Sequence, residues 1–413
     1  MAARRISLAG AAALLAWVGA GSPPQARATD WDASLDMRLV AADAPTSFID
    51  GGLGILRYGG DRDGVELGRA RLAVSQDLGD LLTLKIDASA WGQHDRNPVD
   101  LTEAYLQLHP YPFGDWRARL KLGAFYAPIS LENRAEGWES PYTLSSSALD
   151  SWVAQELRTI GAEFKLEWLG THSGHAFDAS AALGVYGWNQ VAGDSLIDSG
   201  FTITDWQGSL FGTVGRPSGV TGANAEYHQF DNRAGTYVGM DVRYLDRITV
   251  QALHYDNHAN PTVEDNVTGV YAWETRFDTA GVRGEDEDGW TAIVQWMAGA
   301  TYVAPDEVGL LEWDFVTRYV LISKRTGPHT LSVRYDDFKV GAKQTFPAGD
   351  QAGHALTLAY RFEPNSHWRF TLEWVRARSF DGNRLVLEGA APFSTESNVQ
   401  LAIRYALSTH WPE

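Results

Sequence analysis

The feature that most constrains this chain is a repeated alternation of apolar and polar side chains, each run lasting about ten residues and ending at turn residues. The last run shows it most clearly, with Val399, Leu401, Ile403, Tyr405 and Leu407 on one face and Gln400, Ala402 and Arg404 between them. Successive side chains of a β-strand point to opposite sides, so the pattern predicts strands with one apolar and one polar face. A soluble β-sandwich and a membrane-spanning β-barrel both fit this pattern.

The N-terminus has the pattern of an export signal. Arg4 and Arg5 precede an apolar stretch from Ile6 to Ala20, and Ala26-Arg27-Ala28 offers a small-x-small cleavage site. We therefore interpret residues 1–28 as a signal peptide. A retained membrane anchor is the alternative, but about 15 apolar residues are fewer than the roughly 20 that a spanning helix needs. No run of 18 apolar residues follows, which leaves a soluble or a barrel protein.

Charge and composition exclude several classes of function. The formal net charge is -18, and removal of residues 1–28, with three arginines and no acids, changes it to -21. Such an acidic chain is not expected to bind nucleic acid. The chain has no cysteine, so an exported fold must be stable without disulfides. The 11 histidines show no H-E-x-x-H arrangement, and we expect neither a metal site nor a cofactor.

Sixteen strands are predicted from where the alternation starts and stops. They cover residues 31–40, 65–77, 81–91, 100–109, 116–126, 158–168, 176–188, 236–245, 247–257, 270–282, 290–299, 310–323, 330–338, 354–362, 367–378 and 397–407. Short connections alternate with long ones such as 127–157, 189–235 and 379–396. Short turns at one rim, long loops at the other and an even strand number are typical of an outer-membrane barrel. We therefore expect an all-β, transmembrane antiparallel β-barrel over residues 29–413, although 41–63 and 200–230 could each hold a further strand.

The free-energy cost of placing charged side chains in lipid decides which face of a strand points inward. Turning Arg117, Arg119 and Lys121 toward lipid would cost roughly 2 to 4 kcal/mol each near the membrane midplane, so this basic face must line the lumen. The same rule places further charged pairs in the lumen and aromatic residues on the lipid side. The inward pairs are Lys85 and Asp87, Glu163 and Lys165, Asp241 and Arg243, Glu274 and Arg276, Arg334 and Asp336, and Arg369 and Glu373; the outward aromatics are Trp168, Trp313, Tyr319, Tyr360, Phe362, Trp368, Trp374 and Tyr405.

The segment 127–157 is the candidate constriction loop. It carries Glu132, Arg134, Glu136, Glu139, Asp150 and Glu156, and it follows the basic strand face. Folded into the lumen, its carboxylates would face cations across a narrow place and create a transverse field. The alternative is that it stays outside as a solvated lid. The candidate pore-lining residues are Arg117, Arg119, Lys121, Glu132, Arg134, Glu136, Glu163 and Lys165.

A family resemblance enters at the same place. The stretch Phe125-Tyr126-Ala127-Pro128-Ile129-Ser130-Leu131-Glu132, followed by Arg158-Thr159-Ile160-Gly161, resembles the passage from strand to third loop in the porin O and P family of phosphate-selective outer-membrane porins. Segments 237–261 and 354–376 are similar to those of uncharacterised proteobacterial porin-like proteins. The resemblance implies sixteen strands, a homotrimer and an inward-folded third loop. In that family anion choice rests on ladders of arginine and lysine, whereas here carboxylates match the lumen cations.

These patterns predict a porin in the cell outer membrane, which is a passive diffusion channel for small hydrophilic solutes without enzymatic activity. The charged lumen could make this channel charge-selective. Its expected partners are outer-membrane lipids and lipopolysaccharide, the solutes themselves, the barrel-assembly machinery and two further copies of the chain. A substrate-specific transporter or exporter barrel is the first alternative. An outer-membrane hydrolase is the second, because Ser145, Ser146 and Ser147 lie in a long loop, although no G-x-S-x-G surrounds them.

Overall fold

The structure is a computed structural model that describes residues 29–92, 99–208, 210, 213–214, 224–225, 227–265, 269–344 and 349–409. The predicted signal peptide, residues 1–28, lies outside the described residues. No helix in the described part of the chain is long and apolar enough to cross a membrane.

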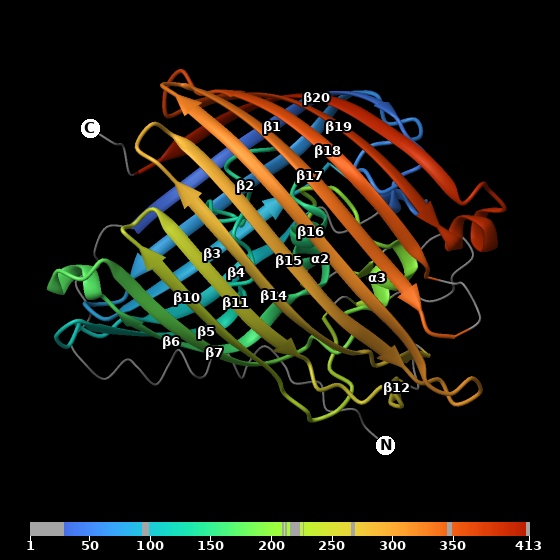
Figure 1. Ribbon diagram of the computed structural model, residues 1–413, viewed down its shortest axis with the longest axis horizontal. Coiled ribbons are helices and arrows are strands. Elements are labelled where there is room, and N and C mark those ends of the chain that lie inside the picture. The colour runs from blue at the N-terminus through green and yellow to red at the C-terminus, as the bar shows by residue number, and fades with distance from the viewer. Residues whose placement is uncertain are drawn as a thin grey trace.

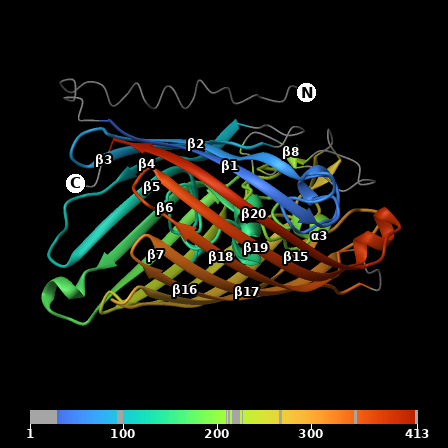
Figure 2. The same ribbon diagram turned by 90° about the horizontal axis from the view of Figure 1, so that it is seen from above.

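Sixteen antiparallel strands close into one barrel, in which each strand pairs with its neighbours along the chain and the last pairs with the first (Figures 1 and 2). The strands are β1 (Thr29–Asp43), β2 (Gly64–Asp77), β3 (Leu82–Ala90), β4 (Val99–Leu108), β5 (Trp116–Tyr126), β6 (Arg158–Trp168), β7 (Phe177–Gly187), β10 (Gly235–Tyr244), β11 (Ile248–Asp256), β14 (Glu274–Glu285), β15 (Trp290–Val303), β16 (Leu311–Thr326), β17 (His329–Ala342), β18 (Gln351–Phe362), β19 (Trp368–Asp381) and β20 (Phe393–Ser408). Each matches one predicted strand, so the predicted fold class is confirmed.

Shorter elements lie in the connections. The two-stranded sheets β8 (Thr213–Val214) with β9 (Asn224–Ala225) and β12 (Glu264–Asp265) with β13 (Val270–Tyr271) are outside the barrel sheet. The helices are η1 (Phe48–Asp50), α2 (Ala148–Glu156), η2 (Gly170–Ser173), α3 (Asp194–Ser199) and η3 (Arg384–Glu388). Among their described residues, the regions 41–63 and 200–230 therefore add no further strand to the barrel.

The two rims differ as the sequence predicts. The start of β1 and the end of β20 meet at one rim, where Asp32 pairs with Ser408, and this rim carries the short turns. The other rim carries the long connections, of which L1 (44–63), L3 (127–157) and L4 (188–234) matter most below. Short turns are typical of the periplasmic side of outer-membrane barrels and long loops of the extracellular side.

The outer surface carries an apolar band, because one phase of each strand turns outward. On β20, Val399 and Leu401 are exposed, whereas the intervening Gln400 is buried toward the lumen. Trp368 and Tyr405 lie on the outside near the periplasmic rim, with their ring centroids 4.8 Å apart. An apolar band ending in aromatic rings is what a lipid bilayer requires of a closed barrel, so the chain is an outer-membrane barrel.

An apolar core around α2 fills the part of the extracellular half of the lumen that lies against β14–β17. Trp152 of α2 contacts rings from the wall and from L4: Phe315 at 4.9 Å, Phe277 at 5.6 Å and Phe201 at 6.1 Å between centroids. The predicted outward placement of Trp313 and Tyr319 is wrong, because both are buried in this core, 4% and 1% exposed. Inner positions at this level must be apolar to pack against α2.

The predicted inward placement of Glu274 and Arg276 is wrong for the same reason. On β14 the buried phase is Thr275 and Phe277, and Phe277 packs on Trp152. Arg276 is exposed on the outside, where its Nη2 donates to the Tyr302 hydroxyl at 2.9 Å. At the extracellular end of β14 the inner phase therefore packs against the apolar core and the outer phase is polar.

Candidate constriction and channel lining

L3 crosses the lumen and is hydrogen-bonded to three strands far from its own. The Leu131 amide donates to Oε1 of Gln295 on β15 at 2.9 Å, and the Ala148 amide donates to Oδ1 of Asp336 on β17 at 3.0 Å. The Leu144 amide donates to Oε2 of Glu373 on β19 at 2.6 Å. These contacts span most of one side of the barrel, so L3 divides the lumen.

Arg334 on β17 is the centre of the L3 attachment. Its fully buried guanidinium forms ion pairs with Glu132 at 2.8 Å and with Asp336 at 2.9 Å. It also donates to the backbone oxygens of Ser145 at 2.7 Å and Ser146 at 2.8 Å. Because every one of these partners except Asp336 belongs to L3, a single side chain holds both halves of the loop against the wall.

Glu132 therefore does not line the channel as the sequence suggested. Its side chain is completely buried, paired with Arg334, and accepts from the Ser147 amide at 3.0 Å. Ser147 in turn caps α2, and its hydroxyl donates to Asp150 at 3.1 Å. Burial and the nearby Glu132 raise the pKa of Asp150 well above its usual range.

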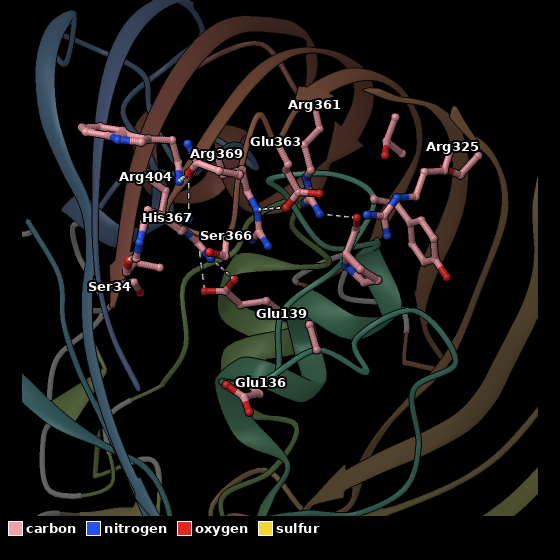
Figure 3. Close-up of a pocket in the computed structure, with 18 of the residues that line it drawn as sticks. Ser34, Glu136, Glu139, Arg325, Arg361, Glu363, Ser366, His367, Arg369 and Arg404 are labelled. Atoms are coloured by element: carbon pink, nitrogen blue, oxygen red, sulfur yellow. Dashed lines mark hydrogen bonds and ion pairs between the residues drawn. The ribbon is translucent and has the colours of Figure 1, made fainter. Parts of the chain in front are cut away.

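Glu139 is an L3 carboxylate that, like Glu136, faces the open part of the lumen. It forms ion pairs with Arg404 at 2.5 Å and with Arg69 at 2.9 Å. Burial alone would raise its pKa, but the two guanidinium groups outweigh burial and hold the pKa well below the usual range. Figure 3 shows Glu139 on the loop pointing toward Arg404 on the wall. This pair joins the edge of L3 to β20.

Asp205 of L4 completes the boundary of the passage. It pairs with Arg38 of β1 at 2.5 Å and with Arg57 of L1 at 2.9 Å. Burial opposes ionisation, but Arg38 and Arg57 together keep the pKa of Asp205 well below its usual range. L1, L4 and the wall are thereby tied by one ionised carboxylate.

The space beside L3 consists of a wide cavity and a narrow one. The wide cavity, about 760 Å³, lies between L3 and the wall, and the narrow one, about 20 Å³, has room for about one water. Glu139, Arg361, Arg369 and Arg404 line both, so the two cavities adjoin (Figure 3). The narrow one is also lined by Arg38 and Asp205.

Most predicted pore-lining residues form ion pairs along another part of the wall. Arg117 and Arg119 both pair with Glu167, at 2.7 and 3.0 Å. The other two pairs are Lys121 with Glu163 at 3.5 Å and Lys165 with Asp241 at 3.1 Å. All lie in the inward phase of β5, β6 and β10, as predicted, but the cations among them do not face the carboxylates of L3.

The two remaining predicted residues lie at the exposed edge of L3. Arg134 is exposed, and Glu136 approaches Arg71 of β2 at 3.6 Å. Arginines of other strands form ion pairs or hydrogen bonds with L3: Arg69, Arg71, Arg334, Arg361 and Arg404. The sequence predicts that each of these arginines points inward, because each lies in the polar phase of a predicted strand. It does not predict their contact with L3, because the strands that carry them are far from L3 in the sequence.

No protein-family model and no curated protein sequence matches this chain. Solved structures match it across most of its length. The outer-membrane channel DcaP of Acinetobacter baumannii has a TM-score of 0.56 at 11% identity, covering 92% of this chain and 96% of DcaP. A loop-deletion mutant of OmpT, an outer-membrane protein of Vibrio cholerae, has a TM-score of 0.50 at 12% identity, covering 92% and 99%. At these identities the likeness concerns the fold, and it supports an outer-membrane barrel.

Proposed function

We propose that this protein is a passive channel for small hydrophilic solutes whose passage runs between L3 and the wall formed by β1 and β18–β20. The observation that carries the proposal is the charged, narrow cavity that adjoins the wide one beside L3. A sixteen-stranded barrel is wide enough for an aqueous channel, and an inward loop reduces it to a selective path. DcaP, which shares the fold, is described as an outer-membrane channel.

The charge around the narrow cavity favours anions over cations. Arg38, Arg361, Arg369 and Arg404 line it, against the carboxylates Glu139 and Asp205. Arg361 has no carboxylate within ion-pair distance among the described residues; it donates to the backbone oxygen of Ser140 at 3.3 Å and to that of Pro141. An excess of fixed positive charge at a constriction raises the local concentration of anions. The preference is expected to be weak, since acids and bases nearly balance around the wide cavity.

Ion selectivity tests the proposal. The reversal potential of purified protein in a planar bilayer, measured under a salt gradient, should indicate anion preference, and Arg361→Gln should move it toward cations. Arg119→Gln is the matched control, because it removes the same charge from an inward position beside Glu167. An equal shift in both variants would place the selective region elsewhere, and the absence of conductance steps would contradict the channel itself.

The buried serines of L3 bear on the hydrolase alternative. Ser147 caps α2, and the Ser146 hydroxyl accepts from the Asn133 side chain at 2.9 Å. The backbone oxygen of Ser145 accepts a hydrogen bond from Arg334, and the Ser145 amide donates one to Glu373 at 3.1 Å. These contacts give all three a structural role in holding L3, and none is arranged as a nucleophile beside a histidine in the described residues. A non-enzymatic channel is therefore the function we favour.

A further inference from the structure

Charged side chains interrupt the apolar outer surface near the extracellular ends of β17, β18 and β19. Lys339, His354, Arg376 and Arg378 are all exposed and lie in the outward phase of their strands. Their neighbours in the other phase, such as Phe338 and Val375, are buried toward the lumen. We call these four residues the outer basic patch. Figures 1 and 2 show their three strands side by side.

Strand register brings the patch together. His354 pairs directly with Arg378 across β18 and β19, and Asp337, two residues from Lys339, pairs with His354 across β17 and β18. Arg376 lies two residues from Arg378 on the same face. Adjacent strands are about 4.8 Å apart, so the patch is about 10 Å wide, which one multiply charged head group can span.

The depth of the patch follows from its neighbours. Toward the periplasmic side the same outward face continues with Tyr335 on β17 and Trp374 on β19, and then with apolar residues including Leu358 and Leu372. Amphipathic rings favour the interface between lipid tails and head groups. The outer basic patch lies just beyond these rings, on the side of the long loops, which is the head-group level of the outer leaflet.

The protein provides too little negative charge for this patch. Asp337 is the nearest carboxylate in register, and it forms an ion pair with Arg318 at 3.1 Å. Lys339, Arg376 and Arg378 have no carboxylate within ion-pair distance among the residues that the structure describes. Other charges on the outside have a partner within the protein: His254 lies 2.8 Å from Asp278, Lys343 pairs with Asp314, and Arg276 donates to the Tyr302 hydroxyl. A local excess of cations is thus found on a chain whose formal net charge is -18.

We propose that the outer basic patch binds the phosphate groups of a phosphorylated glycolipid in the outer leaflet. Two arginines and a lysine fit this chemistry, since guanidinium groups bind phosphate oxygens in pairs and lysine adds a compact charge. The occupant is a lipid rather than a solute, because the patch lies on the outside of the barrel, next to the apolar band and away from the lumen. A lipid bound there shields the excess charge that the protein leaves uncompensated.

Binding of a defined lipid tests this proposal. Delipidated full-length protein in neutral detergent is titrated with lipid A and with the same lipid after removal of its phosphates. Wild-type protein should prefer the phosphorylated form. Arg376→Gln with Arg378→Gln should weaken its binding about thirtyfold, at about fivefold per charge near a membrane surface.

The matched control is Arg247→Gln with Lys324→Gln, which removes two charges at the periplasmic rim, one exposed (Arg247) and one half-buried (Lys324). It should leave lipid binding within about twofold of wild type. Equal affinity of the patch variant and wild type, or equal affinity for the dephosphorylated lipid, would overturn the assignment. Channel conductance is recorded on both variants, and because neither changes the lumen, loss of lipid binding with normal conductance separates this inference from the proposed function.

Discussion

Replacing Arg334 by methionine should release L3 from the wall. Methionine keeps a similar length but provides no donor. Glu132 and Asp336, both fully buried, then lose the only guanidinium partner that they have among the described residues. Glu373 also lies close enough to Arg334 for their opposite charges to attract each other. Breaking a buried ion pair by removing one partner typically costs about 3 to 5 kcal/mol. Here the cost falls on the attached state of L3, since the barrel strands keep their own hydrogen bonds.

That cost predicts a large change in the position of the loop. About 3 to 5 kcal/mol corresponds to a shift of more than about a hundredfold between attached and released loop. Single-channel conductance should therefore rise and fluctuate more in Arg334→Met than in wild type. The chain has no cysteine, so Ala148→Cys, which lies at a completely buried position in L3, reports the release directly. Its labelling by a water-soluble maleimide should be slow in the wild-type background and fast beside Arg334→Met.

Two further variants test whether Arg334 holds L3 against the wall. Arg376→Met, an outward-facing arginine on β19, is the control for loss of an arginine from the barrel and should change neither readout. Adding Glu132→Gln to Arg334→Met removes one of the stranded charges and should restore part of the attachment, as a coupled pair requires. Unchanged conductance and labelling in Arg334→Met, in protein shown to be folded by its heat-modifiable migration, would mean that Arg334 does not hold L3.

Three other perturbations follow from the structure. Glu156 of α2 is buried, accepts hydrogen bonds from the amides of Gly193 and Ser195 in L4, and has its pKa raised to about 7 by burial. Because the folded state keeps this proton while the unfolded chain loses it near 4.5, the contact between L3 and L4 should weaken by about 3 kcal/mol as the pH rises from about 4.5 to 7. Labelling of Ala148→Cys should therefore become faster over this pH range, and Glu156→Gln should remove the pH dependence. Leu401 lies midway along β20 and Leu407 lies at its periplasmic end. Leu401→Arg should therefore destabilise the inserted barrel by roughly 2 to 4 kcal/mol and Leu407→Arg by at most about 1 kcal/mol, and equal losses of folded protein in gel migration assays would contradict these depths. Asp205→Asn leaves Arg38 and Arg57 without their shared carboxylate and should increase anion preference in the reversal potential, and an unchanged value would exclude Asp205 from the passage.

All sixteen strands could be predicted because each one follows a local rule. Alternation with period two is visible in about ten residues, and the cost of turning cations toward lipid fixes its phase, as for Arg117, Arg119 and Lys121 on β5. The attachment of L3 follows no such rule. Glu132 and Arg334 are 202 residues apart, and each alone is an ordinary charged residue in a loop or in a polar phase. Only the closure of the barrel places β17 opposite the end of β5.

The errors over Trp313, Tyr319, Glu274 and Arg276 have a common physical origin. The rule that apolar residues face lipid and charged residues face the lumen assumes that the lumen holds water throughout its height. In the extracellular half α2 and Phe201 occupy it, so the inner positions of β14 and β16 must exclude water, as Phe277 and Phe315 do. The outer positions at that height have passed the apolar band and are free to be polar, as Arg276 is. A strand whose apolar phase switches sides along its length therefore indicates, in a barrel, both a filled lumen and the edge of the membrane. The same reversal on β19, from Leu372 and Trp374 to Arg376 and Arg378, marks where lipid tails end and where the outer basic patch begins.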